Sequence, residues 1–213
     1  FYIFPLHNPV WREAGGSPMC SCGRPDCVSI GKHPRSKNGE KDATVNLEVI
    51  RQWWTKWPDA NIGLATGPSD LAVLDVDGPE GFVELTVAAA GDLPATLSAT
   101  TGKGAHLFYR RHGARIQSVQ RKGEALGVRA STGYVVAPPS LHARGHRYAW
   151  VDPNVAIADV PTWVAGFAAG GSRSVTASLP TGVIRPEAIR SCSGADSPHK
   201  LEMEVMRYKS EYG

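Results

Sequence analysis

The sequence lacks long hydrophobic runs, and no apolar stretch approaches the roughly 20 residues that a membrane-spanning helix needs. This shortage excludes such a helix. Residues 1–6 also lack the charged region that opens a secretory signal peptide, and their composition favours the first strand of a fold. We therefore expect a cytoplasmic protein with no membrane partner.

An excess of charge of one sign is missing over the whole chain, because the formal net charge is only +3. The local distribution is more informative. Between positions 106 and 147 the sequence has eight Lys and Arg residues and one acid, Glu124. A basic segment of this kind, in a chain that also has a predicted strand with two acids, is typical of a protein that binds a polyanion, either nucleotide or nucleic acid. A solvated basic face is the alternative.

The predicted strand with two acids lies at residues 71–78. It is an apolar run of β-favouring residues that ends at Gly followed by Pro. Alternate strand residues share a face, so Asp75 and Asp77 would point to one side, about 7 Å apart at Cα, while Val76 points to the core. Two carboxylates in this arrangement suit a hard cation such as Mg²⁺ or Mn²⁺. A strand that ends in an acidic turn is the alternative.

Cysteine is scarce as well, with four residues in 213, but three of them lie within eight positions. Residues 18–35 add one histidine and several turn-forming residues, a pattern that favours a tetrahedral zinc site. The predicted ligands are Cys20, Cys22, Cys27 and His33. Four protein ligands leave no open position, so the zinc would be structural and would hold a loop that has almost no core. The alternatives are a disulfide, and a substrate contact by His33 beside Lys32.

Apolar periodicity and turn residues predict a mixed α+β domain that is mainly antiparallel after residue 95. A helix over 46–57, capped by Asn46, would bury an apolar stripe. The residues of this stripe are Leu47, Ile50, Trp54 and Trp57. The other predicted elements are a helix over 81–90 and strands over 61–66, 94–101, 105–110, 126–130, 133–140 and 146–151, with a hairpin connection at 131–133.

A tight Gly-Lys-Gly turn at 102–104 leads into the strand that carries His106. Glycines allow backbone N–H groups to approach a phosphate, and Lys103 adds positive charge. The turn is too short for a Walker A loop, so by itself it is a weak phosphate signal. A hydrogen-bonded core histidine is the alternative for His106.

These motifs occur in one order, and the combination is specific although each piece is not. The pieces are Cys20-x-Cys22-x₄-Cys27, Gly31-Lys32-His33-Pro34, Trp53-Trp54, Asn61-Ile62-Gly63, Asp75-Val76-Asp77, Gly102-Lys103-Gly104-x-His106 and the segment 133–140. Together they resemble the bifunctional primase–polymerase (prim-pol) domain of the archaeo-eukaryotic primase superfamily, which occurs in plasmid and phage replication proteins and in other mobile elements.

The resemblance covers residues 1–165, including the zinc-binding loop at 18–35. It implies an α/β module packed on an RRM-like antiparallel module, with the active site in the cleft between them. It also implies template-directed synthesis from dNTPs or NTPs with Mg²⁺ or Mn²⁺, on a DNA template and primer, with a helicase domain or protein as partner. A linker at 166–185 and a C-terminal helical segment at 186–213 would follow this domain.

The resemblance also implies roles for single residues. Asp75 and Asp77 match a motif whose carboxylates hold the catalytic metals, and His106 matches a histidine that contacts the incoming triphosphate. Lys103 and Gly104 would lie beside that triphosphate. Weaker candidates for nucleotide contacts are Arg129, Ser140 and Lys32.

One position departs from the family pattern. The family has a third acid on the strand before the Gly-Tyr-Val-Val segment, and here that position is Gly127. Either Glu124 replaces it through a register shift, or two carboxylates suffice, or the domain is a weak or inactive polymerase. Two further functions therefore stay open: an inactive zinc module that binds nucleotide or nucleic acid, and a metal-dependent nuclease.

Overall fold

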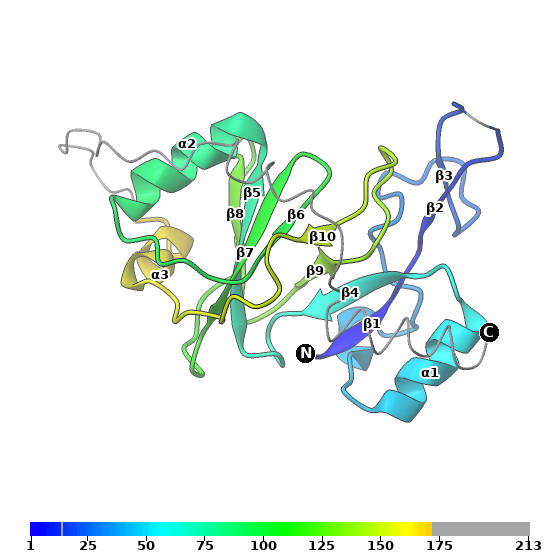
Figure 1. The fold of residues 1–213 in the computed structure, drawn as a ribbon, viewed down its shortest axis with the longest axis horizontal. Helices are drawn as coiled ribbons and strands as arrows, with labels where there is room; N and C mark the ends of the chain where they lie inside the picture. Colours follow the sequence, from blue (N-terminus) through cyan, green and yellow to red (C-terminus); the bar gives the residue numbers. More distant parts are fainter. Residues whose placement is uncertain (14, 172–213) are drawn as a thin grey trace.

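The computed structural model describes residues 1–13 and 15–171, and within them the chain forms antiparallel sheets and three α-helices (Figure 1). The helices and strands in chain order are β1 (Ile3–Leu6), β2 (Pro9–Val10), β3 (Met19–Cys20), the 3₁₀ helix η1 (Gly39–Asp42), α1 (Leu47–Lys56), β4 (Asn61–Ala65), β5 (Leu71–Asp77), α2 (Gly78–Ala89), β6 (Ser98–Thr100), β7 (Gly104–Arg110), β8 (Leu126–Arg129), β9 (Tyr134–Ala137), β10 (Ala149–Trp150) and α3 (Thr162–Ala168). The predicted α+β class is confirmed.

The larger sheet has five strands in the order β10-β6-β7-β5-β8, and helices α2 and α3 cover one of its faces (Figure 1). Strand β5 lies between β7 and β8 and pairs antiparallel with both. Alternate residues of β5, namely Ala72, Leu74 and Val76, are fully buried in the core beneath the two helices. The alternation that predicted this strand is therefore present.

The smaller sheet, in the order β1-β4-β9, lies toward the other face of the larger one. A second core joins the two, and it contains Leu71 and Val73 of β5, Leu64 of β4 and Trp54 of α1. Because every second residue of a strand points to the same face, Asp75 and Asp77 lie on the same face of β5 as Leu71 and Val73. The two acids therefore point to the side of the smaller sheet, where the second core ends.

Helix α1 begins and ends where its sequence predicts. The side chain of Asn46 accepts hydrogen bonds from the backbone N–H groups of Glu48 and Val49, at 2.9 and 3.3 Å. The predicted stripe is wrong at its first position, since Leu47 is 48% exposed. The buried stripe starts one turn later and includes Trp53, which packs against the core.

Three other predicted elements differ in the structure. Strand β8 pairs with β5 whereas β9 pairs with β4, so residues 130–133 cross from one sheet to the other and form no hairpin. The strand predicted over 146–151 shortens to Ala149–Trp150, because Arg147 pairs with Leu141 in the preceding turn. Helix α2 begins at Gly78, three residues early, because Pro79 is compatible with a first helical turn.

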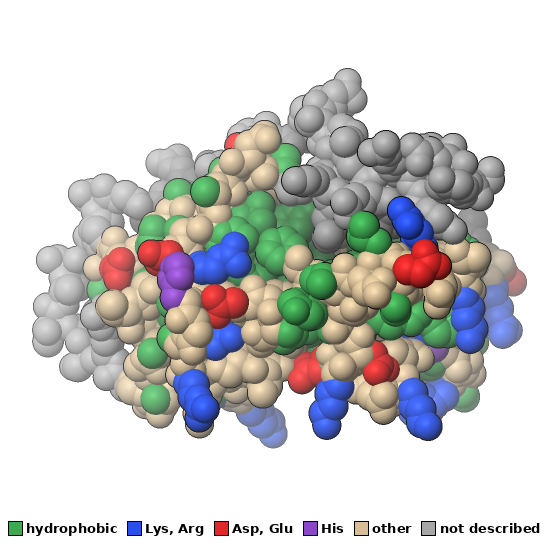
Figure 2. All heavy atoms as spheres, turned by 90° about the horizontal axis from the view of Figure 1, so that it is seen from below, with side chains coloured by type: hydrophobic (Ala, Val, Ile, Leu, Met, Phe, Trp, Pro, Cys, Tyr) green, Lys and Arg blue, Asp and Glu red, His purple; other side chains and the backbone are tan. Residues whose placement is uncertain are grey.

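Helix α3 ends at Ala168, so helical structure extends past the predicted linker start at residue 166. The remainder of that linker and the predicted segment 186–213 lie outside the described residues. No helix in the described part of the chain is both long and apolar enough to cross a membrane. On the described part of the face in Figure 2, Lys and Arg side chains are interspersed with Asp and Glu and are not gathered into one basic patch.

Candidate active site

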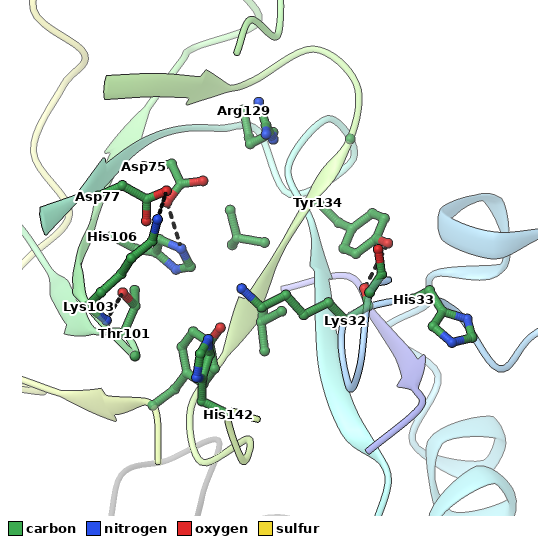
Figure 3. A pocket seen from close by; sticks show the side chains of 16 residues that line it. Lys32, His33, Asp75, Asp77, Thr101, Lys103, His106, Arg129, Tyr134 and His142 are labelled. Carbon is green, nitrogen blue, oxygen red and sulfur yellow. Dashed lines mark hydrogen bonds and ion pairs between the residues drawn. The ribbon is translucent and has the colours of Figure 1, made fainter. Parts of the chain in front are cut away.

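A cavity of about 420 Å³ lies between the two sheets (Figure 3). One wall is the end of the larger sheet, with side chains from β5, β7 and β8 and from the turn 101–103. The other wall is strand β9 and the loop segment that contains Lys32 and His33. The volume falls within the range of small-ligand sites in proteins.

Both predicted acids face this cavity from β5. The Oδ2 atom of Asp77 lies 2.9 Å from Lys103 Nζ, and the Oδ1 atom of Asp75 lies 3.3 Å from His106 Nε2. A positively charged or proton-bearing nitrogen therefore stands against each carboxylate. Carboxylate oxygens are hard ligands, and two of them on one strand face fit a divalent cation that would take the place of these nitrogen groups.

The ionisation of Asp75 depends on its surroundings. Burial opposes the charged form, but the hydrogen bond from His106 and the charges of Arg129 and Lys32 outweigh it. The pKa of Asp75 is consequently below its ordinary value, and its side chain is a carboxylate at neutral pH. This is the form that a metal ligand requires.

His106 lies on β7 directly opposite Asp75 and is only 5% exposed. Its ring is near those of Phe108 and Tyr148, at centroid separations of 6.2 and 6.0 Å. Its Nε2 atom faces Asp75, and its buried Nδ1 atom has no hydrogen-bond partner among the described residues. The histidine is therefore both packed in the wall and turned toward the acids.

The Gly-Lys-Gly turn has a different role from the one its sequence predicts. The hydroxyl of Thr101 accepts hydrogen bonds from the backbone N–H groups of Lys103 and Gly104, at 3.4 and 3.0 Å, so these groups do not point at a ligand. A Cβ atom at Gly104 would lie 1.8 Å from the carbonyl oxygen of Val76. Glycine is needed there because strand β7 approaches β5 closely, while Lys103 alone carries the turn's charge into the cavity (Figure 3).

The opposite wall contributes cationic and aromatic groups. Lys32 extends across the cavity toward the acids, and its backbone carbonyl accepts a 2.9 Å hydrogen bond from the Tyr134 hydroxyl (Figure 3). His142 lines the cavity too, and burial together with the charges of Lys32 and Arg144 lowers its pKa. Sequence reasoning missed His142 and Tyr134, and the segment Gly133 to Ser140 was the one signal that could have indicated the tyrosine.

Two of the predicted nucleotide-binding residues are not brought to the cavity. Ser140 is buried, and its hydroxyl accepts a 2.8 Å hydrogen bond from the backbone N–H of Ile62. Gly104 does not line the cavity either. Arg129 does line it, and its Nη1 donates to the carbonyl oxygen of Val119 at 3.2 Å. The register-shift explanation for Glu124 is wrong, because that acid pairs with Arg121 at 3.0 Å, away from the cavity.

The predicted zinc ligands form a cluster next to this wall. Cys20, Cys22, Cys27 and His33 bring four ligand atoms within 4.8 Å of one another. The Nε2 atom of His33 lies 3.3 Å from Cys20 Sγ and 3.5 Å from Cys27 Sγ. These separations are compatible with one zinc ion at bond lengths of about 2.0–2.3 Å. All three thiols are free, so the disulfide alternative is wrong.

The thiol of Cys22 has a lowered pKa, which suits a metal ligand. A hydrogen bond from the backbone of Arg24 lowers its pKa to about 6, which favours the thiolate. On the other side of the cluster, His33 packs against His7 at a ring separation of 4.4 Å. His33 therefore belongs to the cluster of predicted zinc ligands and also lines the cavity, through the same short segment as Lys32.

The family model described as bifunctional DNA primase/polymerase, N-terminal, matches residues 1–163 of the chain. The chain belongs to this Prim-Pol family. The match covers nearly all the described residues and ends within α3. No curated protein matches the sequence.

Membership in the Prim-Pol family supports a primase/polymerase-type function, and at the family level it implies nucleotidyl transfer with nucleotide and nucleic-acid substrates. The α+β prim-pol fold predicted from the sequence is confirmed. In this Prim-Pol domain the cavity lies between a larger sheet that carries the acids and a smaller sheet that is joined to the cysteine loop.

Proposed function

We propose that this Prim-Pol domain is a DNA primase/polymerase that copies a DNA template from dNTPs or NTPs in the replication of a plasmid, phage or other mobile element, together with a helicase. The observation that carries the proposal is the convergence of two carboxylates and several cationic side chains on one cavity of a Prim-Pol chain. We assign Asp75 and Asp77 as ligands of Mg²⁺ or Mn²⁺, and the cysteine cluster as a structural zinc site.

In nucleotidyl transfer the primer 3′-hydroxyl gives up its proton to solvent, and its oxygen bonds to the α-phosphorus of the nucleotide. The bond from that phosphorus to the β-phosphate oxygen breaks, and pyrophosphate leaves. Divalent cations bound by the two aspartates would lower the charge on the attacking oxygen and the leaving phosphate. Lys32, Lys103 and Arg129 face the same space and would bind the triphosphate electrostatically. Because the catalysis is mainly positioning and charge, these groups suffice for the chemical class.

His106 has a double role in this proposal. Its hydrogen bond favours the ionised form of Asp75 and fixes the orientation of that carboxylate. It also lines the cavity next to Lys103. Once a cation takes the place of His106 on the Asp75 carboxylate, the freed histidine would contact the triphosphate. The 420 Å³ cavity supports a nucleotide-sized ligand between the two walls.

Primer extension tests the proposal. A labelled primer on a longer DNA template is incubated with the protein, dNTPs and Mn²⁺ or Mg²⁺, beside the Asp75→Ala/Asp77→Ala variant. The wild type should extend the primer and the double variant should not. Glu124→Gln is the matched control, because it removes an acid that does not line the cavity, and it should extend as the wild type does.

Other results would support a rival function. Extension by the double variant would refute the assignment of the aspartates. Degradation of DNA without dNTPs would favour a nuclease that uses the same carboxylates. Binding of DNA and nucleotide without any extension would favour an inactive binding module. The structural reason would be Gly127, which is paired with Asp75 where the family has a third acid.

A further inference from the structure

Gly127 lies directly beside Asp75 in the sheet, at the position where the family pattern has a third acid. On β5, Asp75 is paired with His106 of β7 on one side and with Gly127 of β8 on the other. Side chains of directly paired residues lie on the same face of an antiparallel sheet, with Cβ atoms about 4.5–5.5 Å apart. A side chain at 127 would therefore stand next to the Asp75 carboxylate, on the face that carries both acids.

The space above Gly127 is filled by Gln120. A Cβ atom at 127 would lie 2.0 Å from Gln120 Oε1 and 2.9 Å from Gln120 Cδ. The amide oxygen of Gln120 thus occupies the place where a side chain at 127 would begin. Gly127 itself is buried although it has no side chain, because Gln120 covers it.

Backbone pairing determines where Gln120 lies. Val119 and Val128 exchange two hydrogen bonds of 2.8 Å, so the segment before Arg121 runs along the free edge of β8. In this register Gln120 is the residue opposite Gly127. Four residues consequently lie side by side across the neighbouring strands, in the order His106, Asp75, Gly127 and Gln120. The side chain of Gln120 extends back over Gly127.

The orientation of the amide is determined as well. Its Nε2 donates a 3.1 Å hydrogen bond to the backbone carbonyl of Glu124. The reverse orientation would place two oxygen atoms against each other, so Oε1 is the atom that faces the sheet. No described residue donates a hydrogen bond to Oε1, which leaves its lone pairs available.

We propose that the side-chain oxygen of Gln120 replaces the missing side chain of residue 127 and serves as a neutral ligand for the divalent cation bound by Asp75. This inference rests on the proposed function, since it concerns the same metal site. Amide oxygens are ordinary ligands of hard cations, but they bring no charge. The site therefore keeps its third oxygen while it has one negative charge fewer than a three-carboxylate site.

The obvious alternative is that Gln120 only fills space over a glycine. The Gln120→Met variant distinguishes the two roles, because methionine has a similar length and shape but lacks the amide oxygen. Gln120→Glu keeps the oxygen and adds a charge. Gln117→Ala is the matched control, an exposed glutamine of the same segment three residues away.

Binding of Mn²⁺ to the zinc-loaded protein, without DNA or nucleotide, is measured by electron paramagnetic resonance of the free ion. Relative to the wild type, Gln120→Met should weaken Mn²⁺ binding about tenfold, the lower end of what partners of metal ligands contribute. Gln120→Glu should bind Mn²⁺ more tightly, and Gln117→Ala should bind it as the wild type does. Thermal unfolding should give the same Tm for all four proteins in the absence of Mn²⁺.

A further variant moves the oxygen to the strand itself. Gly127→Asp combined with Gln120→Ala removes the amide that would collide with the new side chain, and it should bind Mn²⁺ at least as tightly as the wild type. If Gln120→Met binds Mn²⁺ like the wild type and Gln120→Glu gains nothing, the glutamine is a spacer and the inference is wrong. Should Gln120→Met fail to fold, Gln120→Glu and the double variant decide the question.

The outcome is separable from that of the proposed function. A wild-type protein that extends primers while Gln120→Met binds Mn²⁺ unchanged would refute only the role of Gln120. A wild-type protein that binds Mn²⁺ through Asp75 and Gln120 but extends nothing would refute the polymerase proposal and support this inference. Mn²⁺ binding that is unaffected by Asp75→Ala/Asp77→Ala would refute both.

Discussion

The sheet wall of the cavity and the loop part of the opposite wall, residues 18–35, are held by different forces. On the sheet wall, Asp75 lies between Leu74 and Val76, which are fully buried beneath α2 and α3. The loop wall, residues 18–35, has one hydrophobic residue in the core, Cys20 at 4% exposed, and its Val28 is 98% exposed. Burial of apolar side chains therefore stabilises the sheet wall, whereas residues 18–35 bury almost no apolar surface.

Polar contacts replace the missing core of the loop wall. Arg35 Nη2 donates hydrogen bonds to Asn8 Oδ1 and Ser21 Oγ, both at 2.7 Å, and Asn61 Nδ2 donates to the carbonyl of Gly31 at 2.8 Å. Beside them stands the cluster of potential zinc ligands. We therefore expect metals to act in opposite ways on the two walls. The sheet would fold first and then bind cations, while the loop would need its metal in order to fold.

The largest effect expected from this difference is a loss of activity without a loss of stability. Asp77→Asn removes a proposed cation ligand, which should lower primer extension by about 10³-fold or more. Its ion pair with Lys103 is partly exposed, so the free energy of unfolding should change by less than about 1 kcal/mol. Steady-state extension and urea unfolding measure the two quantities. A variant that unfolds as easily as it loses activity would show that the acids also hold the sheet wall.

Loss of Cys27, a proposed zinc ligand, should have the second largest effect, and on the loop wall. Cys27→Ser should lower the zinc content from about one equivalent toward zero, expose residues 18–35 to proteolysis, and raise the KM for nucleotide about tenfold as Lys32 loses its position. The kcat should change less than the KM, because the sheet wall stays folded. Cys192→Ser, which removes the one cysteine of the sequence that is not a predicted zinc ligand, is the control. Equal effects of both substitutions would contradict the role of the loop.

The same contrast explains which parts of the structure the sequence predicts. Strand β5 was predictable because alternation of apolar and acidic residues encodes both its faces, and the ligand cluster because Cys and His are rare and closely spaced. The connection between β8 and β9 was not, because Gly-bounded short strands carry no information on which sheet they join. The prediction of a hairpin at 131–133 followed from sequence proximity alone.

The candidate site shows the same limits. Asp75, Asp77, Lys103 and His106 belong to local motifs, and all four line the cavity as expected. His142 lines it from a segment with no motif of its own, which long-range hydrogen bonds between Asn61 and Leu141 hold in place. Gln120 does not line the cavity and lies over Gly127, the residue paired with Asp75. Ser140 was expected as a nucleotide contact but is used to satisfy a buried backbone group, and only a structure can reveal such a partner.

A smaller effect is expected from the cationic groups that face the acids. Lys32→Ala removes the one lysine that the loop wall extends across the cavity (Figure 3). We expect a rise in the KM for nucleotide of roughly fivefold, equivalent to about 1 kcal/mol, that weakens at high salt. Lys37→Ala removes an exposed lysine nearby and should leave the KM unchanged. The same rise in both variants would show a general electrostatic effect and no contact by Lys32.

The smallest effect concerns the pH dependence of stability on the sheet wall. The pKa of Asp75 is lowered below its ordinary value of 3.8, so its ionised form stabilises the fold above that pH, and this stability is lost as pH falls through the lower, folded value. His106→Asn removes the hydrogen bond that opposes the burial penalty, so the pKa of Asp75 should rise. Urea unfolding at pH 6 and pH 3 should then show a smaller acid-induced loss for the variant than for the wild type, by up to about 1.4 kcal/mol per pKa unit.

An exposed pair supplies the control for this last prediction. His112 Nε2 and Asp159 Oδ1 are 2.6 Å apart, but their side chains are 66% and 81% exposed, so water already solvates both groups. His112→Asn should therefore leave the acid-induced loss of stability as it is in the wild type. If His106→Asn and His112→Asn behave alike, then Asp75 gains nothing from its buried partner. Its ionisation would in that case depend on Arg129 of the same sheet and on Lys32 of the loop wall. Through Lys32 the two walls would be electrostatically coupled even before a nucleotide binds.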